Sequence, residues 1–95
     1  MTGLPKEPAL KIIRTLETSP RYLYAGVMGW VCGECDCRFS LAIRGIFRCG
    51  TRSFLQAGAG ILAESLPEAE LLETSYKLSV MKDALASAVG ATRVL

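Results

Sequence analysis

The amino-acid sequence predicts an α+β fold: a helix, a three-stranded antiparallel meander and a second helix. Residues 5–17 and 67–86 carry apolar side chains at the spacing of an amphipathic helix. Residues 22–57, which lie between them, are rich in aromatic, β-branched and small residues and contain turn signals. Because neighbouring strands joined by short turns usually pair with each other, this order favours one antiparallel sheet covered by helices.

The first predicted helix covers residues 5–17. Pro5 suits a first helical turn. Apolar residues then recur at helical spacing: Ala9, Ile12, Ile13 and Leu16. The segment 18–21 contains Pro20 and is typical of a turn that ends the helix.

The sheet is predicted to contain three strands joined by a cysteine-containing loop and a short turn. The strands are expected at 22–31, 38–49 and 53–57, the loop at 32–37 and the turn at 50–52. Because side chains alternate between the two faces of a strand, Tyr24 shares a face with Met28 and Trp30. In the second strand, Arg44 lies on the face opposite Phe39.

The second predicted helix covers residues 67–86. Ser65 and Glu68 have the spacing of a capping box at its start. Three charged residues share one face by their spacing: Glu70, Glu73 and Lys77. They border an apolar stripe that we expect to be buried: Ala69, Leu72, Tyr76, Val80 and Ala84. The tail 87–95 is predicted to fray.

The composition predicts one small domain with more apolar residues than so short a chain usually buries. Of the 95 residues 51% are hydrophobic, and the net charge is +2. The interspersed charges indicate neither a nucleic-acid nor an anionic-membrane partner, and no apolar stretch is long enough to span a membrane. No signal peptide is evident. We therefore expect a cytoplasmic protein with mostly reduced cysteines, which is a piece of a larger body or an oligomer.

Residues 56–61 are predicted to be a strand end followed by a glycine turn. Gly58 and Gly60 can adopt positive φ, and consecutive exposed N–H groups in such a turn form a nest that suits a carboxylate or phosphate. The alternative is a simple turn that binds nothing.

Taken together, these motifs are similar to those of a known family. The chain resembles the C-terminal end of the chorismate-utilising enzymes, which include anthranilate, aminodeoxychorismate, isochorismate and salicylate synthases. The matching segments run in the same order through nearly the whole chain: 2–6, 24–26, 42–44, 57–61 and 67–70, with Glu73, Thr74 and Lys77. The resemblance implies that residues 1–95 are the C-terminal portion of a chorismate-binding domain, an incomplete part of the family's layered α/β sandwich.

The resemblance also implies a magnesium site. In the family, glutamates that match Glu70 and Glu73 help to hold a magnesium ion, which binds the ring carboxylate of chorismate. The lysine that matches Lys77 lies beside this site, where we expect a catalytic and substrate-binding role. From the residues alone, the alternative is a solvated helix face with a Glu73–Lys77 ion pair.

Further substrate contacts are implied by the resemblance at Tyr24, at Arg44 and in the glycine segment. The Tyr24 hydroxyl would face the pyruvyl side chain of chorismate, and the Arg44 guanidinium would grip a carboxylate. The backbone N–H groups of the glycine segment would receive a carboxylate, which gives three more candidates: Gly58, Ala59 and Gly60. The alternatives are an ordinary strand aromatic and an edge arginine whose head reaches water.

The implied activity is a magnesium-dependent conversion of chorismate, in which water or ammonia adds to the ring. Residues 29–30, Phe39 and 77–79 favour an isomerase or lyase of the isochorismate/salicylate synthase type, although Arg38 stands where many isochorismate synthases have an acid. The alternative is anthranilate or aminodeoxychorismate synthase component I.

A hypothesis of a different class is a noncatalytic remnant that binds a partner through uncovered strand edges. The sequence contains no histidine and no strong candidate for a general base. We therefore expect the isolated chain to be inactive, and to associate with the N-terminal part of the domain or with itself.

The cysteines are predicted not to form a metal site. They are arranged as C-x2-C-x-C followed by one distant residue: Cys32, Cys35, Cys37 and Cys49. Zinc sites more often combine two C-x2-C pairs or add histidines, and this sequence has neither.

Protein purified without added metal should therefore contain no stoichiometric zinc or iron when measured by elemental analysis. A stoichiometric metal that is lost when the four cysteines are replaced by serine would contradict this prediction.

Overall fold

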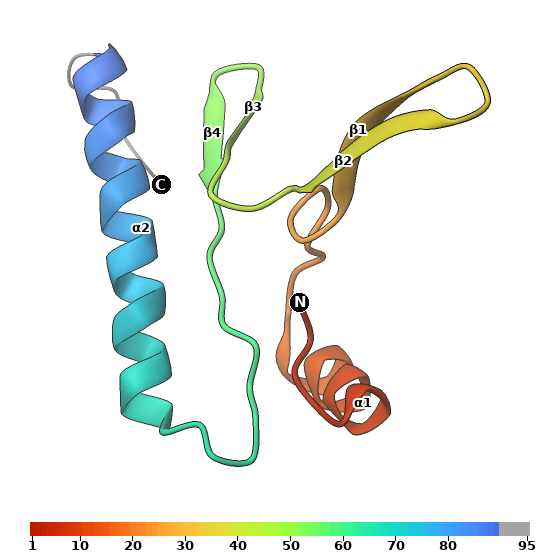
Figure 1. The fold of residues 1–95 in the computed structure, drawn as a ribbon. Helices are drawn as coiled ribbons and strands as arrows, with labels where there is room; N and C mark the ends of the chain where they lie inside the picture. Colours follow the sequence, from red (N-terminus) through yellow and green to blue (C-terminus); the bar gives the residue numbers. More distant parts are fainter. Residues whose placement is uncertain (90–95) are drawn as a thin grey trace.

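The structure, a computed structural model, describes residues 1–89 as two helices and two β-hairpins (Figure 1). The elements are α1 (Lys6–Leu16), β1 (Val27–Cys32), β2 (Asp36–Leu41), β3 (Ile46–Cys49), β4 (Arg52–Leu55) and α2 (Pro67–Val89). The predicted α+β class is confirmed, and the segment between the helices is entirely strand, turn and loop.

The end of α1 is tied to the N-terminal residues by Arg21. Its guanidinium donates hydrogen bonds of 2.6–3.1 Å to both carboxylate oxygens of Glu17, and one of 2.7 Å to the carbonyl of Met1. The same group lies 6.0 Å from the centroid of the Tyr24 ring. Arg21 therefore connects the helix, the N-terminus and a tyrosine that the sequence predicts to be functional.

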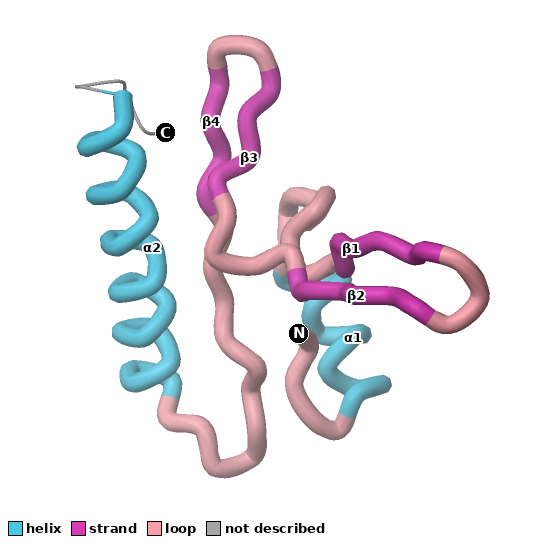
Figure 2. The backbone as a smooth tube through the Cα atoms, turned by 45° about the horizontal axis from the view of Figure 1, so that its top comes forward, coloured by secondary structure: helices cyan, strands magenta, loops and turns pink. Residues whose placement is uncertain are grey.

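The predicted three-stranded meander is replaced by two separate hairpins (Figure 2). Within residues 1–89, β1 pairs with β2 alone and β3 with β4 alone, and both pairs are antiparallel. The second predicted strand, 38–49, is interrupted at 42–45, where Arg44 has a φ of 52°. A left-handed residue cannot continue an extended strand, so the chain turns here and the two hairpins form separately.

The first predicted strand begins too early for the same reason. Tyr22 and Ala25 have φ values of 50° and 63°, so the chain before β1 consists of turns. Tyr24 therefore lies in a turn and not in a strand. Two backbone hydrogen bonds join this turn to Ala42. The Ala25 N–H donates to the Ala42 carbonyl at 2.9 Å, and the Ala42 N–H donates to the Gly26 carbonyl at 2.8 Å.

α2 begins at Pro67, as predicted, and continues past the predicted end at Ala86 to Val89. The rest of the predicted frayed tail, 90–95, lies outside the described residues. The predicted capping box is wrong, because the Ser65 hydroxyl accepts a hydrogen bond from the Leu62 N–H at 3.0 Å instead of capping the helix. A helix that starts at Pro67 places Ser65 one residue before the N-cap position.

The side of α2 that faces the chain is not the predicted apolar stripe. Leu72 and Tyr76, which belong to that stripe, are 72% and 69% exposed. The inward side carries buried or half-buried residues at helical spacing: Glu70, Thr74, Lys77, Met81 and Leu85. Because α2 has apolar residues on both sides, periodicity alone could not identify the inward one.

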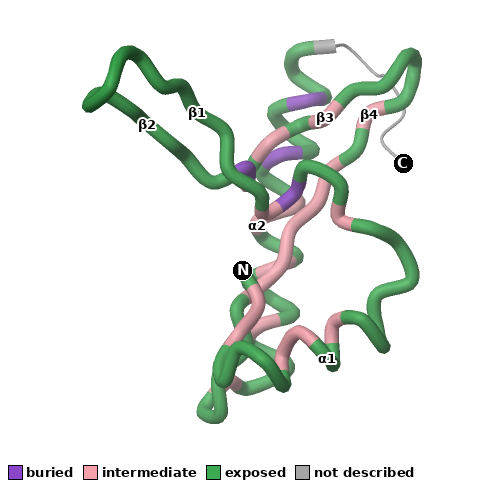
Figure 3. The backbone as a smooth tube through the Cα atoms, turned by 90° about the vertical axis from the view of Figure 1, so that its right-hand side faces the viewer, coloured by how far each residue is buried: buried purple, intermediate pink, exposed green. Residues whose placement is uncertain are grey.

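The core of the described residues is small (Figure 3). Four side chains are buried: Tyr24, Ala42, Met81 and Leu85. The chain exposes 7867 Å², whereas a compact monomer of this mass exposes about 5300 Å². Its dimensions of 45 × 41 × 21 Å describe an open, flat body. None of the helices within residues 1–89 combines the length and the apolar character that crossing a membrane would require.

Gly29 allows β2 to approach β1. A Cβ at this position would collide with the carbonyl oxygen of Arg38 and would lie 2.6 Å from the Phe39 ring. We expect Gly29→Ala to destabilise the hairpin by about 1–3 kcal/mol, measured as lost hydrogen-exchange protection of the β1 and β2 amides. Gly45→Ala is the control, because its methyl would meet the Phe47 ring at an ordinary 3.5 Å. Equal losses in the two variants would disprove this role for Gly29.

Candidate functional site

Two hollows lie between α2 and residues 56–61. This segment is extended but belongs to neither sheet, and it runs antiparallel to the helix. Gly58 therefore lies beside Lys77, whereas Ile61 lies beside Glu70. We call the two spaces the Lys77 hollow and the Glu70 hollow.

The Lys77 hollow brings together four of the predicted substrate-binding residues. It has a volume of about 220 Å³ and is lined by residues that include Tyr24, Arg44, Gly58 and Lys77. They come from the turn before β1, the link between the hairpins, the 56–61 segment and α2. Segments that are far apart in sequence thus meet at one space.

Gly58 is needed for close approach and not for its backbone freedom. Among the described glycines, positive φ occurs at Gly3, Gly33 and Gly50, so the predicted left-handed turn at Gly58 and Gly60 is wrong. A Cβ at Gly58 would lie 3.0 Å from the Tyr24 hydroxyl, whereas a Cβ at Gly60 would meet nothing within 4 Å. The absence of a side chain at Gly58 therefore leaves room for the Tyr24 hydroxyl.

Lys77 joins α2 to the 56–61 segment. Its ammonium donates a 3.3 Å hydrogen bond to the Gly58 carbonyl and forms an ion pair with Glu73, one turn earlier on α2. The hydrogen bond from Lys77 lowers the pKa of Glu73 below its ordinary 4.5, and the charges of Lys77 and Arg44 lower it further. The stabilisation from this pair is thus fully present above pH 4.5 and is lost as pH falls through the lowered pKa.

Arg44 reaches the Lys77 hollow from the link between the hairpins. The predicted mid-strand position is wrong, because Arg44 lies in the left-handed interruption between β2 and β3. Its positive charge contributes to lowering the pKa of Glu73 on α2, and Arg44 and Lys77 both line the hollow. The hollow therefore has a cation on each of two sides.

The backbone N–H groups of residues 58–60 are available to a ligand. Within the part of the chain that the structure describes, none of the three donates a hydrogen bond. They do not form the predicted nest, and Ala59 lines the Glu70 hollow while Gly60 lines neither hollow. Gly58 alone of the three lines the Lys77 hollow together with Arg44 and Lys77. Such a combination favours an anion over a neutral or cationic ligand.

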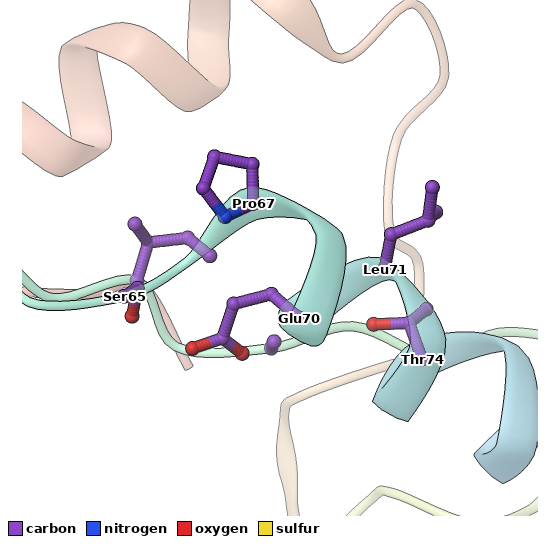
Figure 4. A pocket seen from close by; sticks show the side chains of 7 residues that line it. Ser65, Pro67, Glu70, Leu71 and Thr74 are labelled. Atoms are coloured by element: carbon purple, nitrogen blue, oxygen red, sulfur yellow. The ribbon is translucent and has the colours of Figure 1, made fainter.

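The Glu70 hollow lies between the first turns of α2 and the loop that precedes them (Figure 4). Its volume is about 420 Å³, and it is lined by Ala59, Ile61, Ser65, Pro67, Glu70, Leu71 and Thr74. Figure 4 shows the Glu70 carboxylate extending along the loop toward Ser65, with Leu71 and Thr74 farther along the helix. Two of the predicted site residues line neither hollow: Gly60 and Glu73.

Glu70 and Glu73 supply the type of ligand that magnesium prefers, but too few ligands to complete a magnesium site. Carboxylate oxygens are the hard ligands that Mg²⁺ prefers, and Mg²⁺ requires about six of them in octahedral geometry. Glu70 opens toward its hollow, whereas Glu73 already holds Lys77. Among residues 1–89, no group of three or more histidine, cysteine, aspartate or glutamate side chains could hold a metal ion. Two carboxylates from one helix would supply one side of a magnesium site.

Thr74 and Met81 are site residues that sequence reasoning missed. Thr74 lines the Glu70 hollow, and Met81 lines the Lys77 hollow. Each follows a predicted residue by one helical turn, so extending the face of Glu70 and Lys77 along α2 would have found both. Gln56, the first residue of the predicted glycine segment, also lines the Lys77 hollow, as does Met1, which no sequence signal indicates.

Comparison with known proteins gives consistent results. The family described as chorismate binding enzyme matches residues 1–83. The aminodeoxychorismate synthase component 1 of Bacillus subtilis is 39% identical over 85 residues, which are 90% of this chain and 18% of that protein. The anthranilate synthase component 1 of Saccharolobus solfataricus is 40% identical over 85 residues, which are 90% of this chain and 20% of that protein. The salicylate biosynthesis isochorismate synthase of Pseudomonas aeruginosa is 41% identical over 88 residues, which are 93% of this chain and 18% of that protein.

This chain therefore spans about a fifth of the length of the curated relatives that it matches. No solved structure gives a significant match. The family match covers well over half of the chain and includes every predicted site residue, so the resemblance seen in the sequence motifs is confirmed. The chain belongs to the family of chorismate binding enzymes.

Proposed function

We propose that the chain provides part of the substrate site of a magnesium-dependent, chorismate-converting enzyme. The observation that carries the proposal is the Lys77 hollow, where Tyr24, Arg44, Gly58 and Lys77 converge from separate segments. Family membership supports chorismate as the ligand, and the two cations and unpaired N–H groups support a ligand with carboxylates.

Each group has a defined role in this proposal. The Arg44 guanidinium binds a carboxylate of chorismate through two parallel hydrogen bonds, a geometry that its planar fork favours. The ammonium of Lys77 and the N–H group of Gly58, which line the same hollow, add donors beside it. The Tyr24 hydroxyl, held against Gly58, contacts the pyruvyl side chain. These contacts would orient the ring before any bond is broken, and such orientation lowers the barrier to reaction.

Glu70 and Glu73 are the residues that we propose as magnesium ligands. A bound magnesium ion would neutralise a substrate carboxylate and stabilise negative charge as the ring hydroxyl departs. Because Glu73 is ion-paired with Lys77, the ammonium and a bound cation would compete for the same carboxylate. Lys77 is then the residue that adjusts how strongly Glu73 binds metal.

The described residues do not enclose this site. The Lys77 hollow has a volume of about 220 Å³, which is below the ~300–1,000 Å³ typical of small-molecule pockets. Only one helix supplies candidate metal ligands, and the chain contains no histidine that could serve as a general base. We therefore propose that the 95-residue chain alone does not convert chorismate. The noncatalytic remnant is the alternative, and an assay in a complete fold separates the two.

Sequence identity does not choose the product. Relatives named for three different activities match at 39%, 40% and 41% identity. The isochorismate/salicylate type is our first candidate because of residues 29–30, Phe39 and 77–79, and the anthranilate/aminodeoxychorismate type is the second. Chromatography of the products, with fluorescence for salicylate and anthranilate, distinguishes them.

A chimera provides the complete fold that the test requires. It carries this chain in place of the matching 88 residues of the Pseudomonas aeruginosa relative. With chorismate and magnesium, the chimera should turn over substrate. Glu73→Gln should raise the magnesium concentration for half-maximal activity at least about tenfold, because one anionic ligand is lost.

Glu68→Gln is the matched control, because Glu68 lies on the first turn of the same helix and lines neither hollow. It should leave the magnesium dependence unchanged. A Glu73→Gln chimera with the parental magnesium dependence would remove Glu73 from the metal site.

Gly58 and Gly60 form a second matched pair in the same chimera. Gly58→Ala would push the Tyr24 hydroxyl from its position, so we expect the KM for chorismate to rise about 10- to 100-fold. Gly60→Ala adds the same methyl where nothing lies within 4 Å and should leave the KM near the parental value. Steady-state kinetics measures both, and equal KM values in the two variants would show that Tyr24 does not contact the substrate.

A further inference from the structure

Arg21 is held by two anchors beside the Lys77 hollow, although it does not line the hollow itself. Its guanidinium forms a forked pair with the Glu17 carboxylate, through hydrogen bonds of 2.6–3.1 Å, and donates to the Met1 carbonyl at 2.7 Å. Glu17 directly follows α1, whereas Met1 lies 20 residues away along the chain. A forked arginine–carboxylate pair fixes the orientation of the guanidinium as well as its position.

These contacts differ from those of an ordinary surface ion pair, which contributes little to stability. The side chains of Arg21 and Glu17 are partly covered, at 27% and 38% exposure. The hydrogen bonds between them lower the pKa of Glu17 and raise the pKa of Arg21. Both groups are therefore charged at neutral pH, and the guanidinium stays at the end of α1.

The anchored guanidinium lies against the ring of Tyr24. Its central carbon is 6.0 Å from the ring centroid, and a cation within about this distance of an aromatic face is attracted to it. Tyr24 is buried, with 9% exposure. Among the described residues its hydroxyl makes no hydrogen bond. The position of this hydroxyl therefore depends on what packs against the ring.

The turn that carries Tyr24 is strained. Tyr22 has a φ of 50°, and a non-glycine residue keeps this left-handed conformation only where the surrounding contacts require it. The turn is closed by a hydrogen bond of 2.9 Å from the Tyr24 N–H to the Arg21 carbonyl. Because the Arg21 side chain is anchored, the first residue of the turn cannot move to relieve the strain at the next one.

We propose that Arg21 is a positioning residue for the Lys77 hollow. Anchored to Glu17 and to the Met1 carbonyl, it packs against the Tyr24 ring and fixes the Tyr24 hydroxyl at the hollow. Arg21 does not touch the substrate and acts through Tyr24. The inference rests on the proposed function, which assigns the Tyr24 hydroxyl to the substrate.

Kinetics of the chimera test this role. Arg21→Gln keeps a polar side chain but removes the fork, so it should raise the KM for chorismate about tenfold. The kcat should stay within about twofold, because a lost contact to bound substrate raises KM without changing kcat. Partial unfolding would act in the opposite way, since it lowers the apparent kcat with the folded fraction and leaves the KM unchanged.

Arg14→Gln is the matched control for this variant. Arg14 is an exposed arginine in the last turn of α1 and lines neither hollow. The same substitution there should leave both the KM and the kcat at the parental values.

A double-mutant cycle with Tyr24→Phe shows whether Arg21 acts through Tyr24. Phenylalanine keeps the ring and removes the hydroxyl. If Arg21 serves to place that hydroxyl, Arg21→Gln should raise the KM less than about twofold in the Tyr24→Phe background, because residues that act through one contact are not additive. Independent roles would multiply the two effects.

Hydrogen exchange reports the position of the turn without requiring activity. It is measured at the Tyr24 amide in the full chain and in the chimera. Arg21→Gln should speed this exchange at least about tenfold, because the hydrogen bond to the Arg21 carbonyl opens more often. Arg14→Gln should leave it unchanged. Glu17→Gln removes one anchor, should also speed the exchange, and replaces Arg21→Gln in every measurement if that variant does not fold.

The outcomes separate this proposal from the proposed function. A chimera without turnover contradicts the proposed function, and hydrogen exchange at Tyr24 then decides the role of Arg21 by itself. Faster exchange, together with a raised KM that disappears in the Tyr24→Phe background, supports the positioning role. That role is overturned by any of three results: unchanged exchange at Tyr24, a KM equal to that of Arg14→Gln, or effects of Arg21→Gln and Tyr24→Phe that multiply.

Discussion

The contact between Lys77 and the Gly58 carbonyl holds the two sides of the site at their spacing. α2 has few other attachments to the rest of the described chain, since Met81 and Leu85 are its only buried side chains. The same ammonium is paired with Glu73, so it also limits the free negative charge on this face of the helix. Lys77 therefore ties the two walls together, and with Arg44 it supplies the positive charge that favours an anionic ligand.

Burial explains why the site is only partly built. α2 has apolar residues on two sides, and the β1–β2 hairpin has an apolar face. Within the described residues, α2 packs against the chain on one side, and the apolar face of the hairpin is exposed. A helix or sheet of this kind normally lies between two layers. In this chain one layer is present, so the site residues converge on a hollow with an open side.

Local sequence signals predicted the elements whose structure depends on local interactions. Both helices form where apolar periodicity and the prolines at 5 and 67 place them. The sheet was predicted less well, because the left-handed conformation of Arg44 has no signature in the sequence. A non-glycine residue in this region costs of order 1–3 kcal/mol and occurs where the surroundings require it. Here it divides one strand into two and turns the Arg44 side chain into the Lys77 hollow.

The sequence by itself determined the two helices, the α+β class and the family, and it named four candidate residues that the structure brings to one hollow: Tyr24, Arg44, Gly58 and Lys77. Those features depend on residue type and on the spacing of residues along the chain, and both can be read directly from the sequence. Only the tertiary structure decided which side of α2 faces inward, that Gly58 serves the Tyr24 hydroxyl by close approach and not by positive φ, and that Arg44 meets Lys77 from another segment. These features depend on which distant segments come into contact, and distance in space is not encoded in the spacing of residues along a chain.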